Sequence, residues 1–436
     1  MKFSEVDDLN YQCSIEETYP GELGLMIKKT SFLVVFLPII KLFVKSLVQL
    51  FSTDNKRNFP IGIDTVVIVG SINQYRAVKS LIDALPNVLV LSIFPIKCKN
   101  NVVIDTRGNC IASLLNLPKL IINLVRVIGF KYSSILYHFD DYLNTPGVYN
   151  LAHKYLKEIN PKSIIVANDH TFLTRSYFRA AQKLKISTIY TQHASVTSHF
   201  PSLEFDYAFL DGEETLDKYL SNNEILKSKV FLSGSPRFDK IAEIKNLNNY
   251  ELGVAINLID NHEEVIKFLE LLVLNKVNFC FRPHPGLPNI SFWKEYCKTN
   301  SIGYSDPITE TPIDFISYCK SFAVGDSALH LEVALCGKTS YYFNFQNGNT
   351  SDSYDYIRNG LIEEKDSNEI ILFLKQQIYN KVSTKKIKYY VANFSTKEWG
   401  NSTTLIQKSI MDINNDNKLD FWQEKKVGSY IFEINN

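Results

Sequence analysis

The sequence predicts an α/β protein with two doubly wound parallel sheets, one in each of two domains that face a cleft. The chain has 436 residues, too many for one ordinary core, so we expect two domains of roughly 200 residues each. Short, continuously apolar runs alternate with helical patterns, as they do when parallel strands are buried on both faces. The alternation stops at a polar stretch, 245–253, and then restarts, which indicates two sheets.

The first set of patterns defines an expected domain at 61–246. Strand-like apolar runs lie at 65–70, 88–94, 101–105, 133–138, 162–168, 187–193, 206–211 and 229–234. Helical patterns lie at 72–84, 111–128, 146–158 and 171–184. Strands and helices that alternate in this way are expected to form βαβ units with parallel pairing.

The second set of patterns defines an expected domain at 247–400. Its strand-like runs lie at 251–260, 277–281, 321–325 and 339–345, and its helical patterns at 262–274, 291–299, 329–337 and 366–380. Residues 401–436 are then predicted to be a helical tail, with a helical pattern from 402 to about 412 and an aromatic pair at Phe421 and Trp422.

Residues 1–60 are predicted to be an N-terminal extension, and its main feature is the apolar segment 31–51. Two lysines near the middle, Lys41 and Lys45, would be costly in hydrocarbon, which argues against a membrane-spanning helix. With Gln49 they recur every four residues and form one polar stripe. The pattern fits a helix in the membrane interface, and it fits a core helix under the first domain equally well. Basic residues flank the segment: Lys28, Lys29, Lys56 and Arg57.

Charge and cysteine usage narrow the class of partner and the compartment. The formal net charge is +1, which provides no global field to hold nucleic acid, so no nucleic-acid partner is expected. The seven cysteines are scattered and never spaced C-x-x-C, which argues against a disulfide framework or a zinc site and favours the cytoplasm. Glu5, Asp7 and Asp8 stand where a cleavable signal would need basic residues, so we expect no signal.

The strand at 277–281 is followed by a cation, an imidazole and two prolines. Prolines on both sides of His284 fix the backbone and remove N–H donors, so they hold the imidazole rigidly at the sheet edge. We predict that Arg282, His284 and Pro285 bind a donor molecule. Taken by itself, His284 could also be a structural histidine whose hydrogen bonds are made within the protein.

The strand at 321–325 ends in Gly325, which lets a ligand approach the backbone closely. Ser327 is expected to cap the next helix, whose N-terminus attracts anions, and Glu332 lies about 1.4 turns further along. A phosphate at Ser327 and a hydroxylated ring near Glu332 would describe a nucleotide. The structural alternatives are that Ser327 only caps the helix and that Glu332 lies on a solvated helix face.

Two adjacent strand ends of the first domain carry a carboxylate and an imidazole, Asp169 and His193, which suit a general base for a sugar hydroxyl. Asp260, at the end of the first strand of the second domain, is a third candidate. Asp169 and Asp260 also suit the N-caps of the helices that follow them, and this alternative stays open. Arg237, in the turn at 234–239, is expected to contact the donor or to belong to a hinge.

Several metal- and nucleotide-binding motifs are absent from the sequence. It has no G-x-G-x-x-G, no Walker loop, no H-E-x-x-H and no D-x-D. We therefore expect no metal and no cofactor, with the leaving phosphate stabilised by a helix dipole, His284 and Ser327.

Four stretches, TQHASV, GSPRFD, FRPHPG and GDSALHLEVALCGK, together resemble bacterial transferases of surface polysaccharide. The group includes capsule-polysaccharide transferases, sialyltransferases with a His-Pro motif and CDP-glycerol glycerophosphotransferases, and it has the GT-B fold. The resemblance covers about residues 150–345. It implies an acceptor domain followed by a nucleotide-donor domain, both Rossmann-like. It also implies that His284-Pro285 and Ser327 hold the phosphate and cytidine of a CMP- or CDP-linked donor, and Glu332 its ribose.

The chain departs from this group at three positions. The sialyltransferases carry an acidic-acidic-Gly base motif where this chain has Ile259-Asp260-Asn261, and Ser327 is a single serine rather than a pair. Ala194 stands where the glycerophosphotransferases usually have glycine after the first-domain histidine.

The resemblance implies a metal-independent, inverting glycosyltransferase that moves a nonulosonic acid from a CMP-linked donor to a capsule or lipopolysaccharide glycan. Asp260 or Asp169 would be the base and His193 would orient a substrate. The acceptor is expected to be lipid-linked or free, and the inner face of the plasma membrane is an expected docking surface. Three alternatives stay open: a CDP-glycerol or CDP-ribitol polyol-phosphate transferase with His193 as base, a non-catalytic scaffold of a capsule complex, and a UDP-sugar epimerase.

Overall fold

The chain forms two compact units in the computed structural model, which describes residues 1–18, 35–51, 58–106, 108–126, 132–221, 226–346, 348, 351–426 and 428–435. The first unit contains Met1–Leu210, Thr215–Arg237 and Thr403–Asn435, and the second contains Asp211–Glu214 and Phe238–Ser402. The chain passes from the first unit to the second after Arg237, before the predicted boundary at 246. The cleft predicted between the two domains stays a prediction.

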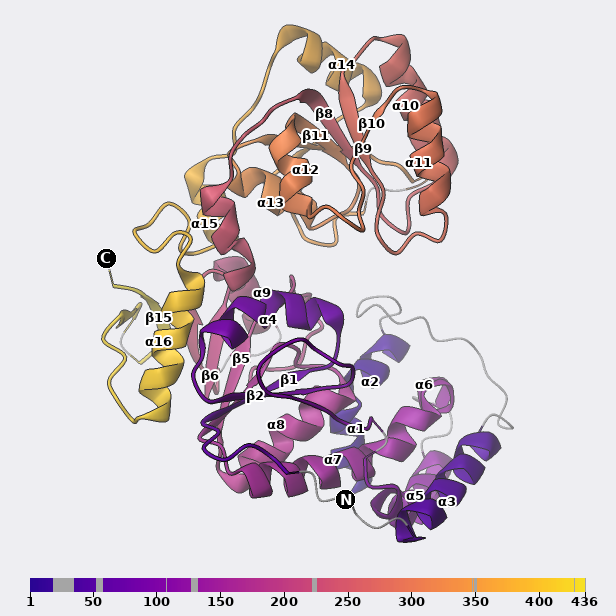
Figure 1. Ribbon diagram of the computed structural model, residues 1–436, viewed down its shortest axis with the longest axis vertical. Helices are drawn as coiled ribbons and strands as arrows, with labels where there is room; N and C mark the ends of the chain where they lie inside the picture. Colours follow the sequence, from indigo (N-terminus) through magenta and orange to yellow (C-terminus); the bar gives the residue numbers. More distant parts are fainter. Residues whose placement is uncertain are drawn as a thin grey trace. The chain divides into compact units, whose positions relative to one another are not determined.

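The first unit is built on a nine-stranded sheet with the order β14-β15-β7-β6-β5-β4-β1-β2-β3 (Figure 1). Its strands are β1 (Thr65–Val69), β2 (Val88–Ser92), β3 (Asn101–Val103), β4 (Ser163–Val166), β5 (Ser187–Thr191), β6 (Tyr207–Leu210), β7 (Lys229–Leu232), β14 (Trp422–Glu424) and β15 (Ile431–Ile434). All neighbours pair in parallel except β14 and β15. The central strands are buried along their whole length, which explains their continuous apolarity.

Helices cover this sheet and connect its strands. They are α4 (Ile72–Ala84), α5 (Cys110–Arg126), α6 (Tyr132–Tyr137), α7 (Phe139–Ile159), α8 (Phe172–Leu184), α9 (Glu213–Ser221) and α16 (Ser402–Asn414). The predicted strand at 133–138 is wrong, because these residues form α6. Ile135 and Leu136 are buried against other helices, and a short apolar run has the same pattern in a buried helix as in a strand.

A layer of helices is added to one side of the first unit. Its first members are α1 (Phe3–Leu9), α2 (Tyr11–Thr18) and α3 (Phe36–Phe51), which pack with α5, α6 and α7 around a separate apolar cluster. Residues 31–34 of the predicted apolar helix, and its flanking Lys28, Lys29, Lys56 and Arg57, lie outside the described residues. No helix in the described part of the chain is long and apolar enough to cross a membrane.

The second unit is built on a six-stranded parallel sheet with the order β10-β9-β8-β11-β12-β13. Its strands are β8 (Tyr250–Ala255), β9 (Phe279–Arg282), β10 (Gly303–Tyr304), β11 (Cys319–Val324), β12 (Thr339–Tyr342) and β13 (Glu363–Glu364). The helices are η2 (Pro236–Glu243), α10 (His262–Leu274), α11 (Ile290–Thr299), α12 (Pro312–Tyr318), α13 (Leu329–Leu335), α14 (Ser367–Gln376) and α15 (Thr384–Tyr390). In both sheets the third strand in chain order lies at one side and the fourth pairs with the first, as in doubly wound folds.

The chain's last residues differ from the predicted helical tail. After α16, the strands β14 and β15 join the first sheet, with Ile431 opposite Val230 of β7 (Figure 1). Trp422 and Phe432 pack their rings on Phe231, which gives this segment an aromatic contact with the sheet.

Candidate functional site

The topology of the second unit brings three of the predicted strand ends to one edge. The strand β8 lies between β9 and β11, so the loop after β8 separates the loop with His284 from the loop with Ser327. The winding direction of the sheet reverses between β8 and β11. Ligands of doubly wound sheets bind at such a point, outside the carboxyl ends of the strands.

Asp260 is the buried acid at this point. Its Oδ2 accepts a 2.8 Å hydrogen bond from the backbone N–H of Asn257, whereas Oδ1 is buried and has no hydrogen-bond partner among the described residues. Burial raises the pKa of Asp260 to about 6, the Asn257 bond opposes this, and the Asp326 carboxylate adds to it. Asp260 is not an N-cap, since Asn261 caps α10 through bonds to Glu263 and Glu264.

Gly325 borders Asp260 across the two strand ends. A Cβ atom on Gly325 would stand 2.9 Å from Oδ1 of Asp260, so the acid lies directly against this glycine. The Gly325 carbonyl is held 2.9 Å from Nε2 of the buried His330, whose Nδ1 lies 2.6 Å from the Ser340 hydroxyl. His330 therefore positions the loop. It stands inside the quoted GDSALHLEV run, but nothing in the sequence pattern distinguished it from an ordinary helix residue.

His284 presents a defined tautomer. Its Nδ1 accepts a 3.0 Å hydrogen bond from the Gly286 N–H, which leaves the ring proton on Nε2. Burial and the Arg282 charge lower the pKa of His284, so the imidazole is neutral at neutral pH and can donate from Nε2. Pro285 is exposed beside it.

Ser327 and Glu332 are both half-buried. Ser327 is not the N-cap, because Ala328 occupies that position, and the Ser327 hydroxyl instead accepts a 3.3 Å bond from the Leu329 N–H. The helix is shorter than the predicted span 329–337, so its dipole contributes less than expected.

Arg282 has a structural environment. Its Nη1 donates to the Ser305 hydroxyl at 2.7 Å and its Nη2 to the Glu310 carbonyl at 2.9 Å, and the side chain is buried. The guanidinium also lies over the Phe315 ring. The Arg282 guanidinium is therefore engaged by Ser305 and Glu310, and it does not form a free cation beside His284.

The first unit assembles a second polar cluster, at the ends of β4 and β5. Both carboxylate oxygens of Asp169 are engaged: Oδ1 lies 3.0 Å from Nδ1 of His170, and Oδ2 accepts a 2.6 Å bond from the Tyr219 hydroxyl. The alternative that Asp169 is an N-cap is wrong, since Thr171 holds that position. A carboxylate with these partners orients its neighbours more readily than it removes a proton.

His193 lies in the same cluster. Burial lowers its pKa to about 4, with smaller effects of the same sign from His170 and Arg237, whereas Asp169 and a bond to the Ala167 backbone act in the opposite direction. Nδ1 of His193 is buried without a hydrogen-bond partner in the described part of the chain. The imidazole is therefore neutral with a free lone pair. Arg237 is half-buried and contributes its charge to this cluster.

Three residues that contact this cluster or its loops were not predicted from the sequence. Tyr219 belongs to α9, and the acids that begin that helix, Glu213 and Glu214, were an available signal for it. Tyr11 of the N-terminal extension bonds the His199 carbonyl at 2.9 Å, and the Gln12 N–H bonds the His170 carbonyl at 3.1 Å. No local pattern predicts that residues 11 and 12 contact loops more than 150 positions away.

Comparison with solved structures decides the fold. A UDP-N-acetylglucosamine 2-epimerase from Neisseria meningitidis bound to UDP-GlcNAc is 14% identical, with a TM-score of 0.52 over 80% of this chain and 100% of its own. A structure described as a UDP-N-acetylglucosamine 2-epimerase from Listeria monocytogenes is 13% identical, with a TM-score of 0.54 over 82% of this chain and 98% of its own. The wall teichoic acid polymerase TagF is 10% identical, with a TM-score of 0.46 over 89% and 99%. This chain has the GT-B fold. No known protein family and no curated protein matches the sequence.

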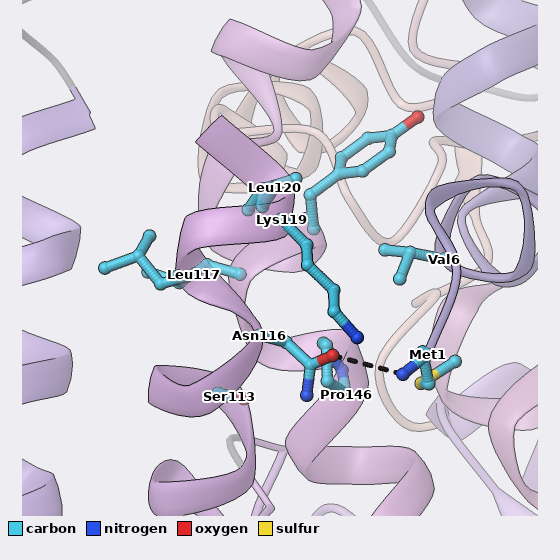
Figure 2. Close-up of a pocket in the computed structure, with 10 residues that line it drawn as sticks. Met1, Val6, Ser113, Asn116, Leu117, Lys119, Leu120 and Pro146 are labelled. Carbon is cyan, nitrogen blue, oxygen red and sulfur yellow. Dashed lines mark hydrogen bonds between the residues drawn. The ribbon is translucent and has the colours of Figure 1, made fainter. Parts of the chain in front are cut away.

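Three hollows of this GT-B fold lie away from the strand ends described above. The gap in Figure 2, between α1, α5 and α7, has a volume of about 10 Å³, room for at most one water molecule, and the Met1 amino group bonds Asn116 beside it. A hollow of about 530 Å³ is bounded by α1, α7 and α8, and another of about 420 Å³ lies at the amino ends of β8 and β9. Neither has the placement expected of a GT-B ligand site.

Among the described residues, one group could offer metal ligands: Cys13, His138 and Asp141, whose ligand atoms lie within 4.8 Å of one another. His138 and Asp141 already form a 3.3 Å pair, and Cys13 belongs to the apolar cluster of the added helical layer. The group is not part of either strand-end cluster.

Proposed function

We propose that this protein is a glycosyltransferase that moves a sugar from a nucleotide-activated donor to a hydroxyl of a glycan. One observation carries the proposal. Asp260 is buried at the point where the second sheet reverses its winding, and it has a pKa of about 6 and an Oδ1 without a hydrogen-bond partner among the described residues. Gly325 lies on one side of it and the loop of His284 on the other. A carboxylate that titrates near the working pH suits a general base.

In this proposal Asp260 removes the proton of the acceptor hydroxyl while the sugar–phosphate bond breaks. The departing phosphate accepts hydrogen bonds from Nε2–H of His284 and from the loop of Gly325 and Ser327. Donors that are fixed before the reaction stabilise developing negative charge without reorganisation, and the bond from Gly286 fixes His284 in this way. Glu332 would accept hydrogen bonds from the ribose. Arg282 would support the loop rather than touch the donor.

The donor that we propose is a CMP-linked nonulosonic acid, and the acceptor a capsule or lipopolysaccharide glycan. The His284-Pro285 pair supports this choice, because the sialyltransferases that the sequence resembles carry a His-Pro motif, and Asp260 supplies one of the two acids of their base motif. A single displacement of the nucleotide by the acceptor hydroxyl inverts the anomeric centre, so the product would have the opposite configuration to the donor.

A polyol-phosphate transferase that uses CDP-glycerol or CDP-ribitol is the second candidate. His193 supports it, because its Nδ1 has no hydrogen-bond partner in the part of the chain that the structure describes, and an imidazole base in the first unit would then activate the acceptor. The pKa of about 4 makes His193 a weaker base than Asp260, and this difference is why we place the candidate second.

The test is turnover of purified protein with a CMP-linked nonulosonic acid and an oligosaccharide acceptor, followed by CMP release and product mass. Asp260→Asn should lower kcat about 10²–10⁴-fold and His284→Ala about 10²–10³-fold. His153→Ala, which removes a half-buried imidazole from α7 in the first unit, is the control and should stay near wild type. Turnover of Asp260→Asn within about tenfold of wild type would refute the assignment of the base.

Nucleotide binding separates the enzyme from a scaffold and from an epimerase. A ligand that binds only the native state raises the melting temperature, so CMP, CDP and UDP are compared in one thermal-shift series. Stabilisation by CMP supports the sialyltransferase-like proposal, whereas stabilisation by UDP alone points to a UDP-sugar enzyme. No response to any of the three supports a non-catalytic role.

A further inference from the structure

The helix α3 exposes an apolar face that a soluble protein would ordinarily bury. Phe36, Ile40, Phe43, Val44, Leu47 and Val48 are between 41% and 61% exposed, and their helical spacing places them on one side. Scattered apolar residues are normal on a surface, but a contiguous patch of this kind marks an interaction site.

The opposite side of α3 fastens the helix to the first unit. Leu42 and Ser46 are buried, and Leu42 belongs to the apolar cluster shared with α5, α6 and α7. Gln49 does not extend the predicted polar stripe outward. Its Oε1 accepts a 2.8 Å bond from the Cys110 N–H at the start of α5, and its Nε2 donates to the Gly108 carbonyl at 3.2 Å. The exposed face is therefore held in a fixed orientation.

The neighbouring helix α5 exposes the same kind of surface. Leu115, Ile121 and Ile122 are exposed, with Lys119 exposed between them. Figure 1 shows α3 and α5 side by side at the margin of the first unit, and the two helices pack against each other. Two helices that pack together thus both expose apolar side chains, and we call their exposed faces the α3–α5 surface.

The charges of the α3–α5 surface have a single sign. Neither helix contains Asp or Glu, whereas Lys41 is exposed and Lys45 is half-buried on α3, and Lys119 lies on α5. Lysine side chains at the rim of an apolar helix reach the headgroups of a bilayer while the apolar residues enter its surface. Anionic headgroups complement two helices that carry lysines and no carboxylates.

We propose that the α3–α5 surface docks this protein on an anionic lipid membrane, with both helices lying in the interface. A second copy of the chain is a poorer occupant, because pairing this surface with itself would bring lysines together without any Asp or Glu of α3 or α5 to neutralise them. The proposal concerns binding alone, so it stands or fails separately from the proposed reaction.

The experiment is flotation of the full chain with two sets of vesicles, phosphatidylcholine alone and phosphatidylcholine mixed with phosphatidylglycerol. Wild type should float with the mixed vesicles and release at high salt. Phe43→Glu/Val48→Glu should lower the partition coefficient at least about tenfold, because two apolar side chains no longer enter the interface. Lys41→Gln should lower it about fivefold at low ionic strength.

The matched control is Val273→Glu/Leu274→Glu, which places the same two charges on exposed apolar positions of α10 in the second unit. It should float like wild type. The proposal is overturned if wild type binds neither kind of vesicle, or if the α3 variant floats as well as wild type. A third result would also overturn it: light scattering shows that wild type is a dimer, the α3 variant is a monomer, and neither binds vesicles. The surface would then join two copies of the chain.

Discussion

The Oδ1 atom of Asp260 lies 2.9 Å from the position that a Cβ atom on Gly325 would occupy. Gly325 is not in the left-handed region, so this position requires glycine for space rather than for backbone conformation. The contact joins the ends of β8 and β11, the two strands between which the second sheet reverses its winding. A side chain at 325 would therefore act on the acid that we assign as the base.

Gly325→Ala should lower turnover about 10²-fold, because the added methyl displaces the Asp260 carboxylate from its place. The stability cost should be about 1–3 kcal/mol, as for other overpacked sites. Steady-state kinetics and urea denaturation measure the two effects. Gly348→Ala, where a Cβ atom would meet nothing within 4 Å, is the control. Unchanged kinetics in Gly325→Ala would show that the contact has no part in the reaction.

The stability of the folded chain should depend on pH through Asp260. Its pKa rises from 3.8 to about 6 on folding, so the folded state keeps a proton that the unfolded chain releases. This contribution is complete below about pH 4 and is lost as the pH rises through about 6. Asp260→Asn cannot ionise, so relative to wild type it should gain on the order of 2 kcal/mol between pH 4 and pH 8. Denaturant titrations at both pH values measure the gain, and an equal difference at both would contradict it.

Arg282→Ala should destabilise the second unit by about 2–4 kcal/mol, because it leaves the Glu310 carbonyl and the Ser305 hydroxyl without their buried donor. The melting-temperature shift produced by CMP should be retained in protein that still folds. Urea denaturation gives the first quantity and thermal shift the second. A stable variant that no longer responds to CMP would restore the predicted role of Arg282 in donor binding.

Tyr219→Phe should cost about 1–3 kcal/mol, because it removes the 2.6 Å hydrogen bond to Oδ2 of the buried Asp169. Tyr207→Phe, at a half-buried tyrosine on β6, serves as the comparison and should change stability by less than about 0.5 kcal/mol. Chemical denaturation of both variants tests this. Equal stabilities would mean that Asp169 does not need the tyrosine hydroxyl.

The strand and helix positions were largely predictable because both sheets are buried on both faces. Continuous apolar runs such as 65–70 and 187–193 became β1 and β5, and the helix predicted at 72–84 has those bounds in the structure. The failure at 133–138 has the same cause, since burial alone does not distinguish a short helix from a strand.

The candidate site was predictable as a set of residue types at strand ends, but not as a set of partners. Asp169 and Arg282 were expected to act on substrates, and the structure gives both of them buried partners within their own units. The partners Tyr219 and Ser305 are distant in sequence from Asp169 and Arg282, and no local pattern predicts such pairs.

By itself the sequence determined the alternation of strands and helices, the two parallel sheets and the chemistry available at the strand ends, because these follow from local periodicity and residue type. Only the tertiary structure decided which groups are satisfied and which are free. It added β14 and β15 to the first sheet and turned Gln49 inward, and among the described residues it gave Oδ1 of Asp260 no hydrogen-bond partner and left the outer face of α3 exposed. The reason is physical: burial and hydrogen-bond partners depend on segments far apart in the chain, and the local pattern holds no record of them.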